Sequence, residues 1–101
     1  MKSFAVETGS PAEFIDRVRR EFAERGLNQF AELAGDDSSL VVRFRWMGTT
    51  ELRYRLEPAD PGFLAFLDHE SVSPLHAPFR QSFDERFDEV LAKVGAKPLG
   101  V

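Results

Sequence analysis

The chain of 101 residues contains no cysteine, which excludes disulfide bonds, thiolate catalysis and cysteine-ligated zinc or iron–sulfur centres. It has no apolar run that approaches the roughly 20 residues needed for a membrane-spanning helix. The first ten residues, MKSFAVETGS, hold one lysine and no apolar segment, so we expect no signal peptide. We therefore expect a single domain over residues 1–101, located in the cytoplasm and without a membrane as partner.

Several functional motifs are also missing from the sequence. It has no glycine-rich phosphate loop, no zinc-binding pattern and no nucleophile elbow. The net charge of −4 gives no overall attraction to nucleic acid or to an anionic membrane. These absences make an enzyme the less favoured class, and the sequence predicts neither a cofactor nor a metal.

Lysine, tryptophan and tyrosine are scarce, with three, one and one residues, whereas arginine and phenylalanine each occur ten times. Arginine in place of lysine is associated with GC-rich bacterial genomes, so we expect a bacterial protein. Ten phenylalanine rings require either a dense core or an exposed apolar patch, because each ring carries a large apolar area.

Two segments have the periodicity of amphipathic helices. In the first, Ser10 and Glu13 form a capping box, Pro11 takes the first helical position, and Gly26 follows the last turn. The second begins near Pro78 and also ends at a glycine. The residues expected to face the core are Phe14, Ile15, Val18 and Phe22 in the first helix and Phe79, Phe83, Phe87, Val90, Leu91 and Val94 in the second.

Four segments favour β-strands. Residues 3–7 alternate between apolar and polar, and residues 40–47 and 51–57 alternate on either side of a turn, which predicts a hairpin. Residues 63–67 are apolar on both sides and are typical of a central strand. Asp60-Pro61 could instead open a short helix at this place.

The remaining segments have weaker patterns. Residues 28–34 are ambiguous, and the interpretation considered is one more helical turn that buries Phe30 and Leu33. Residues 68–76 are polar and are expected to form a loop. Residues 95–101 are expected to form a short flexible tail.

The loop of the hairpin determines which residues of its two strands pair. A two-residue loop would place the two apolar sets on opposite faces of the sheet, so an odd-length loop is preferred. We choose Gly48-Thr49-Thr50 as the loop, which sets Phe44 opposite Tyr54. This register opposes arginines of the two strands, at some cost in repulsion, whereas a shift by one step pairs Arg45 with Glu51.

The predicted order is thus β-α-β-β-β-α, and the simplest packing is a two-layer α+β sandwich. A four-stranded, mainly antiparallel sheet would carry both helices on one face. The order and the final amphipathic helix resemble a reduced form of the helix-grip domains, which hold apolar ligands between a curved sheet and a carboxy-terminal helix. The same order is similar to that of small proteins encoded beside polyhydroxyalkanoate granule genes. No motif specific to either family occurs.

A group of arginines is expected on the outer face of the hairpin, with side chains about 5 to 8 Å apart. Such guanidinium groups can bind an anion or the acidic surface of a partner. The favoured interpretation is a solvated face with Glu51 and Glu57 as partners. Nucleic acid is not expected, because the rings of the hairpin lie on the other face and bases could not stack beside the basic groups. The four residues are Arg43, Arg45, Arg53 and Arg55.

Two other groups of side chains are candidates. An apolar ligand pocket is expected beneath the final helix, lined by Phe44, Trp46, Tyr54 and Phe83. His69 stands beside Asp68 and Glu70, and this is the one place where a histidine could act as a general base or join a metal site. A solvated histidine in a loop is the favoured interpretation of that segment.

These observations give three hypotheses of function. The first is a small non-catalytic accessory or binding domain that acts through protein–protein contact, with a homodimer as one form of that contact. The alternative is a ligand-binding, helix-grip-like domain that holds an apolar small molecule between the sheet and the final helix. The least favoured is an enzyme that uses His69 with Asp68 or Glu70.

Overall fold

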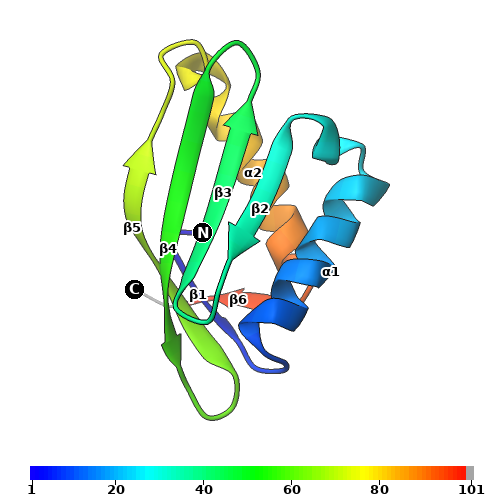
Figure 1. Cartoon of the computed structure of the whole chain (residues 1–101), viewed down its shortest axis with the longest axis vertical. Coiled ribbons are helices and arrows are strands. Elements are labelled where there is room, and N and C mark those ends of the chain that lie inside the picture. Colours follow the sequence, from blue (N-terminus) through cyan, green and yellow to red (C-terminus); the bar gives the residue numbers. More distant parts are fainter. Residues whose placement is uncertain (100–101) are drawn as a thin grey trace.

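A six-stranded antiparallel sheet with the strand order β2-β3-β4-β5-β1-β6 forms one layer of the fold (Figure 1). The computed structural model describes residues 1–99. Its elements are β1 Ser3–Val6, α1 Pro11–Glu24, the 3-10 turn η1 Leu27–Gln29, β2 Ala31–Gly35, β3 Ser39–Arg45, β4 Thr49–Pro58, β5 Phe63–Ser71, the 3-10 turn η2 Ala77–Phe79, α2 Arg80–Lys93 and β6 Ala96–Pro98. The α+β class is confirmed, but the predicted four strands are wrong, because two further strands extend the curled sheet. Within residues 1–99, no helix has the length and apolar character needed to cross a membrane.

One hydrophobic core joins the sheet to both helices. The inward face of the β3–β4 hairpin is buried, as its alternation predicted, through Leu40, Val42, Leu52, Tyr54 and Leu56. The helices contribute Phe14, Ile15, Val18 and Phe22 from α1 and Phe87, Val90 and Leu91 from α2. They also meet each other, since the ring centroids of Phe22 and Phe87 lie 6.2 Å apart. The core therefore depends on helices that are far apart in the chain.

The start of α1 follows from local chemistry alone. The Ser10 hydroxyl oxygen accepts a hydrogen bond from the backbone N–H of Glu13 at 3.2 Å, and Pro11 occupies the first turn. The Ser10 hydroxyl also lies 3.3 Å from the Glu13 carboxylate and donates to it. Gly26 adopts φ 71° immediately after the helix, a backbone conformation that favours glycine. This predicted capping arrangement is confirmed.

The two strands that the sequence did not predict lie at the edges of the sheet (Figure 1). Residues 31–35 form β2 instead of the helical turn considered for 28–34, and they pair with β3. Leu33 is buried in this strand, but Phe30, also expected inside, is 39% exposed. Residues 96–98, predicted to belong to a flexible tail, form β6 and pair with β1. Residues 100–101 of that tail lie outside the described residues.

The hairpin loop has an odd length, as predicted, but the predicted register is wrong. The loop is Trp46-Met47-Gly48, and Phe44 lies opposite Thr50 rather than opposite Tyr54. The observed register pairs Arg43 with Glu51, so the like-charge repulsion of the predicted register does not arise. Gly48, a loop residue in both registers, is the last residue of the observed turn and adopts φ 130°.

β5 is longer than predicted. Residues 63–67 are confirmed as a strand, and no short helix starts at Asp60-Pro61. Residues 68–71, expected to be part of a loop, continue the strand beside β4. Leu67 pairs with Tyr54 and His69 with Arg53, so Asp68 has no partner on β4. This irregularity changes which residues of β5 face inward beyond Asp68.

Candidate functional site

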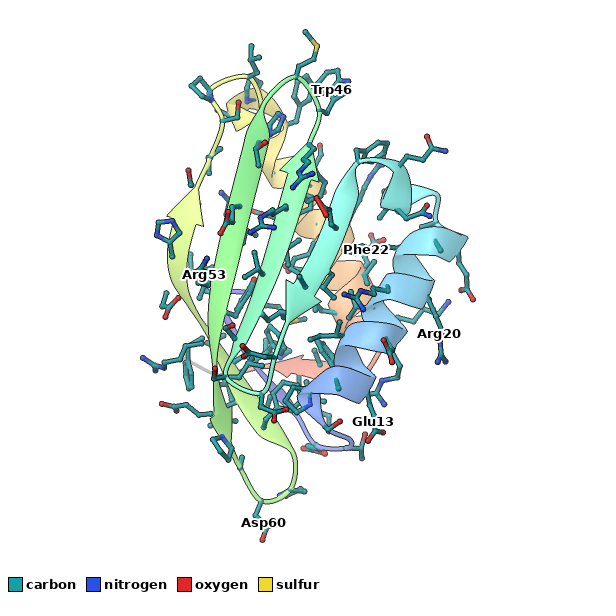
Figure 2. All side chains as sticks on the ribbon, in the orientation of Figure 1. Glu13, Arg20, Phe22, Trp46, Arg53 and Asp60 are labelled. Atoms are coloured by element: carbon teal, nitrogen blue, oxygen red, sulfur yellow. The ribbon has the colours of Figure 1, made fainter. Side chains whose placement is uncertain are left out.

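A solvent-open cavity lies where the β3–β4 hairpin tip, η1 and the start of α2 come together. Its volume is about 550 Å³. Most of its wall is aromatic, with rings from Phe22, Phe30, Phe44, Trp46, Phe79 and Phe83. Figure 2 shows Trp46 at the hairpin end of the molecule, which is also the end at which α2 begins in Figure 1. We call this cavity the aromatic cavity.

The floor of the aromatic cavity is a chain of rings in mutual contact. Phe44 of β3 meets Phe83 of α2 edge to face. Phe83 stacks on Phe87 with 5.8 Å between centroids, and Phe87 meets Phe22 of α1. Aromatic pairs of this kind add about 0.5–1.5 kcal/mol to the burial of the rings themselves. The floor is therefore continuous with the core, to which Phe22 and Phe87 belong and against which Phe44 and Phe83 pack.

The mouth of the cavity leaves large apolar side chains in contact with water. Trp46 is 54% exposed and Phe79 is 55% exposed, and their ring centroids lie 6.0 Å apart. Met47, which follows Trp46, is 69% exposed, and Leu75, four residues before Phe79, is 56% exposed. Trp46 was predicted to face the core, but it lies beyond the last residue of β3, in the turn. We call Phe30, Trp46, Met47, Leu75 and Phe79 the apolar rim.

A polar network attaches the hairpin tip to the segment before α2. His76 Nε2 lies 2.5 Å from the carbonyl oxygen of Trp46, which can only accept, so Nε2 carries the proton and donates it. His76 Nδ1 lies 2.7 Å from the Thr50 hydroxyl, which donates to it in the neutral ring. The backbone N–H of Ser73 donates to the same hydroxyl oxygen at 3.1 Å. Thr50 is only 2% exposed, so this network is the buried polar support of the mouth.

The charged groups at the cavity are two arginines of α2. Arg80 donates from Nε to the Asp84 carboxylate at 2.9 Å, and its Nη1 forms an ion pair with Glu70. Arg86 forms no hydrogen bond or ion pair with another side chain in residues 1–99, and its side chain lines the cavity. Ser82, one helical turn before Arg86, lines the same wall. No carboxylate lines the cavity among the described residues.

Of the four residues predicted to line a pocket, the structure brings Phe44, Trp46 and Phe83 together around the cavity, whereas Tyr54 lies elsewhere. Tyr54 is 1% exposed and packs against Phe4, with 5.4 Å between ring centroids. Its hydroxyl donates to the carbonyl oxygen of Met1 at 2.7 Å. Burial raises the pKa of the Tyr54 phenol, and the nearby Asp88 carboxylate raises it further. Tyr54 is a core residue.

The four predicted arginines lie on the outer face of the hairpin, and each has a carboxylate partner. Glu51 is shared, with Arg43 Nε at 3.3 Å and Arg53 Nη2 at 3.2 Å. The hydrogen bond from Arg43 is the main reason why the pKa of Glu51 is lowered. The other two pairs are Arg45 with Glu32 at 2.9 Å and Arg55 with Glu57 at 3.4 Å. An anion would have to displace these carboxylates, so the geometry favours a solvated, internally paired face.

The histidine candidate is not assembled into a site. His69 pairs with Arg53 across the strands and is exposed, whereas Glu70 bonds to Arg80 of α2. No hydrogen bond joins His69 to Asp68 or Glu70 in the part of the chain that the structure describes. The described residues also contain no group of three or more histidine, aspartate and glutamate side chains that could hold a metal ion.

Sequence reasoning missed several residues of the cavity, namely Phe30, Thr50, His76, Phe79 as a rim residue, and Arg86. They come from η1, β4, the segment before α2 and α2 itself, and no spacing in the sequence connects them. Comparisons of the chain with protein-family models, with curated proteins and with solved structures found no match. The geometry of the cavity is therefore the basis of the function proposed below.

Proposed function

We propose that this protein is a non-catalytic binding domain that holds an apolar small molecule in the aromatic cavity. The observation that carries the proposal is a solvent-open space of about 550 Å³ whose wall is mostly phenylalanine and tryptophan. Small-molecule sites in proteins are concave, mostly apolar and typically about 300–1,000 Å³ in volume. The exposed rings at the mouth support it, because contact with water is unfavourable for them and a bound molecule would remove it.

The cavity has the two parts that such a site needs. The floor at Phe44 and Phe83 packs against the hydrophobic core, which holds the two rings in place without a ligand. The mouth is held by the bonds of His76 to Thr50 and to the Trp46 carbonyl. A site that is ordered in advance loses less conformational entropy on binding, which favours affinity.

The proposal is tested with the fluorescence of Trp46, the only tryptophan of the chain, during titration with decanoate and with 1-decanol. We expect a saturable change in emission with at least one of the two, and a matching heat by calorimetry. Ser82→Phe should block binding of the ligand, because Ser82 lines the cavity and the phenylalanine ring would fill part of it. Gln81→Phe, its exposed neighbour outside the cavity, is the control. Flat titrations with both compounds, or equal binding by the two variants, would rule the proposal out.

A second candidate function, contact with another copy of the chain through the apolar rim, is favoured by Met47 and Leu75. Both are exposed and neither lines the cavity, so a ligand inside it would leave them in water. A symmetric dimer would place the same patch of each copy against the other. Sedimentation over a range of concentrations tests this, since the double variant Met47→Glu/Leu75→Glu should remain monomeric where the wild type dimerises. A wild-type protein that stays monomeric would dismiss this candidate.

A further inference from the structure

The charged residues that line the aromatic cavity are two arginines, and they differ in whether carboxylates pair with them. Arg80 and Arg86 are its charged lining residues, and no carboxylate lines it among the described residues. Arg80 is paired with Glu70 and Asp84, so Arg86 is the lining charge that no ion pair within residues 1–99 offsets. Arg86 is an exposed residue, so water partly screens its attraction for an anion and this attraction depends on salt.

The two arginines differ in what they can still bind. The single N–H of Arg80 Nε is shared between the two carboxylate oxygens of Asp84, at 2.9 and 3.0 Å, and Glu70 pairs with Nη1. Arg86 lines the cavity, is exposed and has no such partner in residues 1–99, so its planar set of donors is free to bind an anion. A negative group would also be repelled by Glu70 and Asp84 near Arg80. Arg86 is therefore the place in the cavity where an anion is most favoured.

Ser82 adds a second polar group beside Arg86. The two residues are four positions apart on α2, which places their side chains on the same face of the helix. Both line the cavity. The serine hydroxyl can donate one hydrogen bond to an oxygen that Arg86 also binds, and a guanidinium binds a carboxylate with two parallel hydrogen bonds.

From this arrangement we infer that the ligand is an apolar molecule that bears a single carboxylate. The carboxylate binds to Arg86 with support from the Ser82 hydroxyl, and the apolar body lies against Phe44, Phe83 and Trp46. This inference rests on the proposed function, since it requires the aromatic cavity to be a ligand site. It adds the chemical class of the ligand and the residue that selects it.

The experiment compares decanoate with 1-decanol, two molecules with the same chain length and different head groups, at neutral pH. We expect the wild-type protein to bind decanoate about tenfold more tightly than 1-decanol, which is the effect of one charge-assisted contact. Arg86→Gln should lower the affinity for decanoate about tenfold and leave that for 1-decanol unchanged. The preference for decanoate should also fall as salt is raised.

A matched control uses Arg20, which lies on the outer side of α1 (Figure 2), is exposed and does not line the cavity. Arg20→Gln changes the net charge by the same amount, and we expect it to affect neither affinity. Equal binding of both compounds by the wild type, or an equal loss of both in Arg86→Gln, overturns the inference while the proposed function stands. A failure of both compounds to bind the wild type overturns the inference and the proposed function together.

Discussion

The hydroxyl of Thr50 on β4 lies 2.7 Å from Nδ1 of His76, which precedes α2 by four residues. This contact joins the tip of a hairpin to a segment 26 positions away in the chain. It orders the mouth of the aromatic cavity without contributing to its apolar wall. The mouth therefore depends on a hydrogen-bonded pair that no local sequence pattern indicates.

Replacement of His76 by alanine should lower the free energy of unfolding by about 1–3 kcal/mol, because the buried Thr50 hydroxyl and the Trp46 carbonyl lose their partner. It should also weaken binding in the cavity. His69→Ala is the matched control, since His69 is exposed, and its effect should stay within about 0.5 kcal/mol. Urea unfolding, followed by Trp46 fluorescence and by circular dichroism, measures the stability of both variants. Equal stability of the two variants would contradict a structural role for His76.

Gly62 lies where β1 passes close to the turn before β5. A Cβ at Gly62 would meet the carbonyl oxygen of Val6 at 1.7 Å, and φ is +77°. Gly62→Ala should therefore be destabilising by about 1 kcal/mol for the backbone conformation plus about 1–3 kcal/mol for the clash. Gly26→Ala is the control, because φ there is +71° and an added Cβ would meet no atom within 4 Å. It should show only the loss that comes from the backbone conformation. Urea unfolding distinguishes them, and equal losses would show that the close approach is absent.

Tyr54 is the only tyrosine, so its ionisation can be followed in the folded protein by absorbance near 295 nm. Burial, with Asp88 nearby, raises its pKa above the ordinary value of 10.0. The unfolded chain then ionises first, so the contribution to stability is present below about pH 10 and is lost as pH rises further. We expect the native phenol to titrate above the unfolded one. An ordinary titration in the folded state would place Tyr54 outside the core.

Tyr54→Phe gives a related but separate result. The variant loses the hydrogen bond to the Met1 carbonyl and should be about 1 kcal/mol less stable at neutral pH. Its stability should fall less between pH 10 and pH 11 than that of the wild type, because one group that favours the folded state by staying protonated is gone. Unfolding curves at several pH values measure both effects. Parallel pH profiles would contradict the assignment.

Glu51 lies on the outer face of the hairpin, where its carboxylate accepts hydrogen bonds from both Arg43 and Arg53. Its pKa is lowered mainly by the hydrogen bond from Arg43, against a smaller opposing effect of burial. Its contribution to stability is thus present above about pH 4.5 and is lost as pH falls through its folded pKa. Glu51→Gln should therefore lose less stability on acidification than the wild type. Identical acid profiles by circular dichroism would show that the ion pairs have no effect.

Much of the fold could be predicted because it depends on contacts close in sequence. The capping of α1 by Ser10 requires residues three positions apart. The alternation of β3 and β4 likewise identifies Val42 and Leu52 as core residues, since a strand turns successive side chains to opposite faces. Three of the four expected pocket residues line the aromatic cavity, but only Phe44 does so from a predicted strand face, since Phe83 belongs to α2 and Trp46 lies in the turn.

Contacts between distant segments decided the rest. Residues 31–35 and 96–98 become strands because edges of the sheet are there to pair with, and neither segment has a strong pattern of its own. The hairpin register was set by Arg43 opposite Glu51 and by the position of Gly48 in the turn. The unpaired Asp68 changes which side chains of β5 face the core, and the alternation of residues in the sequence does not indicate this change.

The sequence by itself determined the class of fold, the two amphipathic helices and the inward face of the hairpin, because periodicity and capping act over a few residues. Only the tertiary structure decided that Trp46 is exposed, that Tyr54 lies in the core away from the cavity, and that Arg86 shares a cavity with Phe44. These outcomes depend on where the hairpin tip ends relative to α2. Such positions result from the packing of the whole chain and are not encoded in any short segment of it.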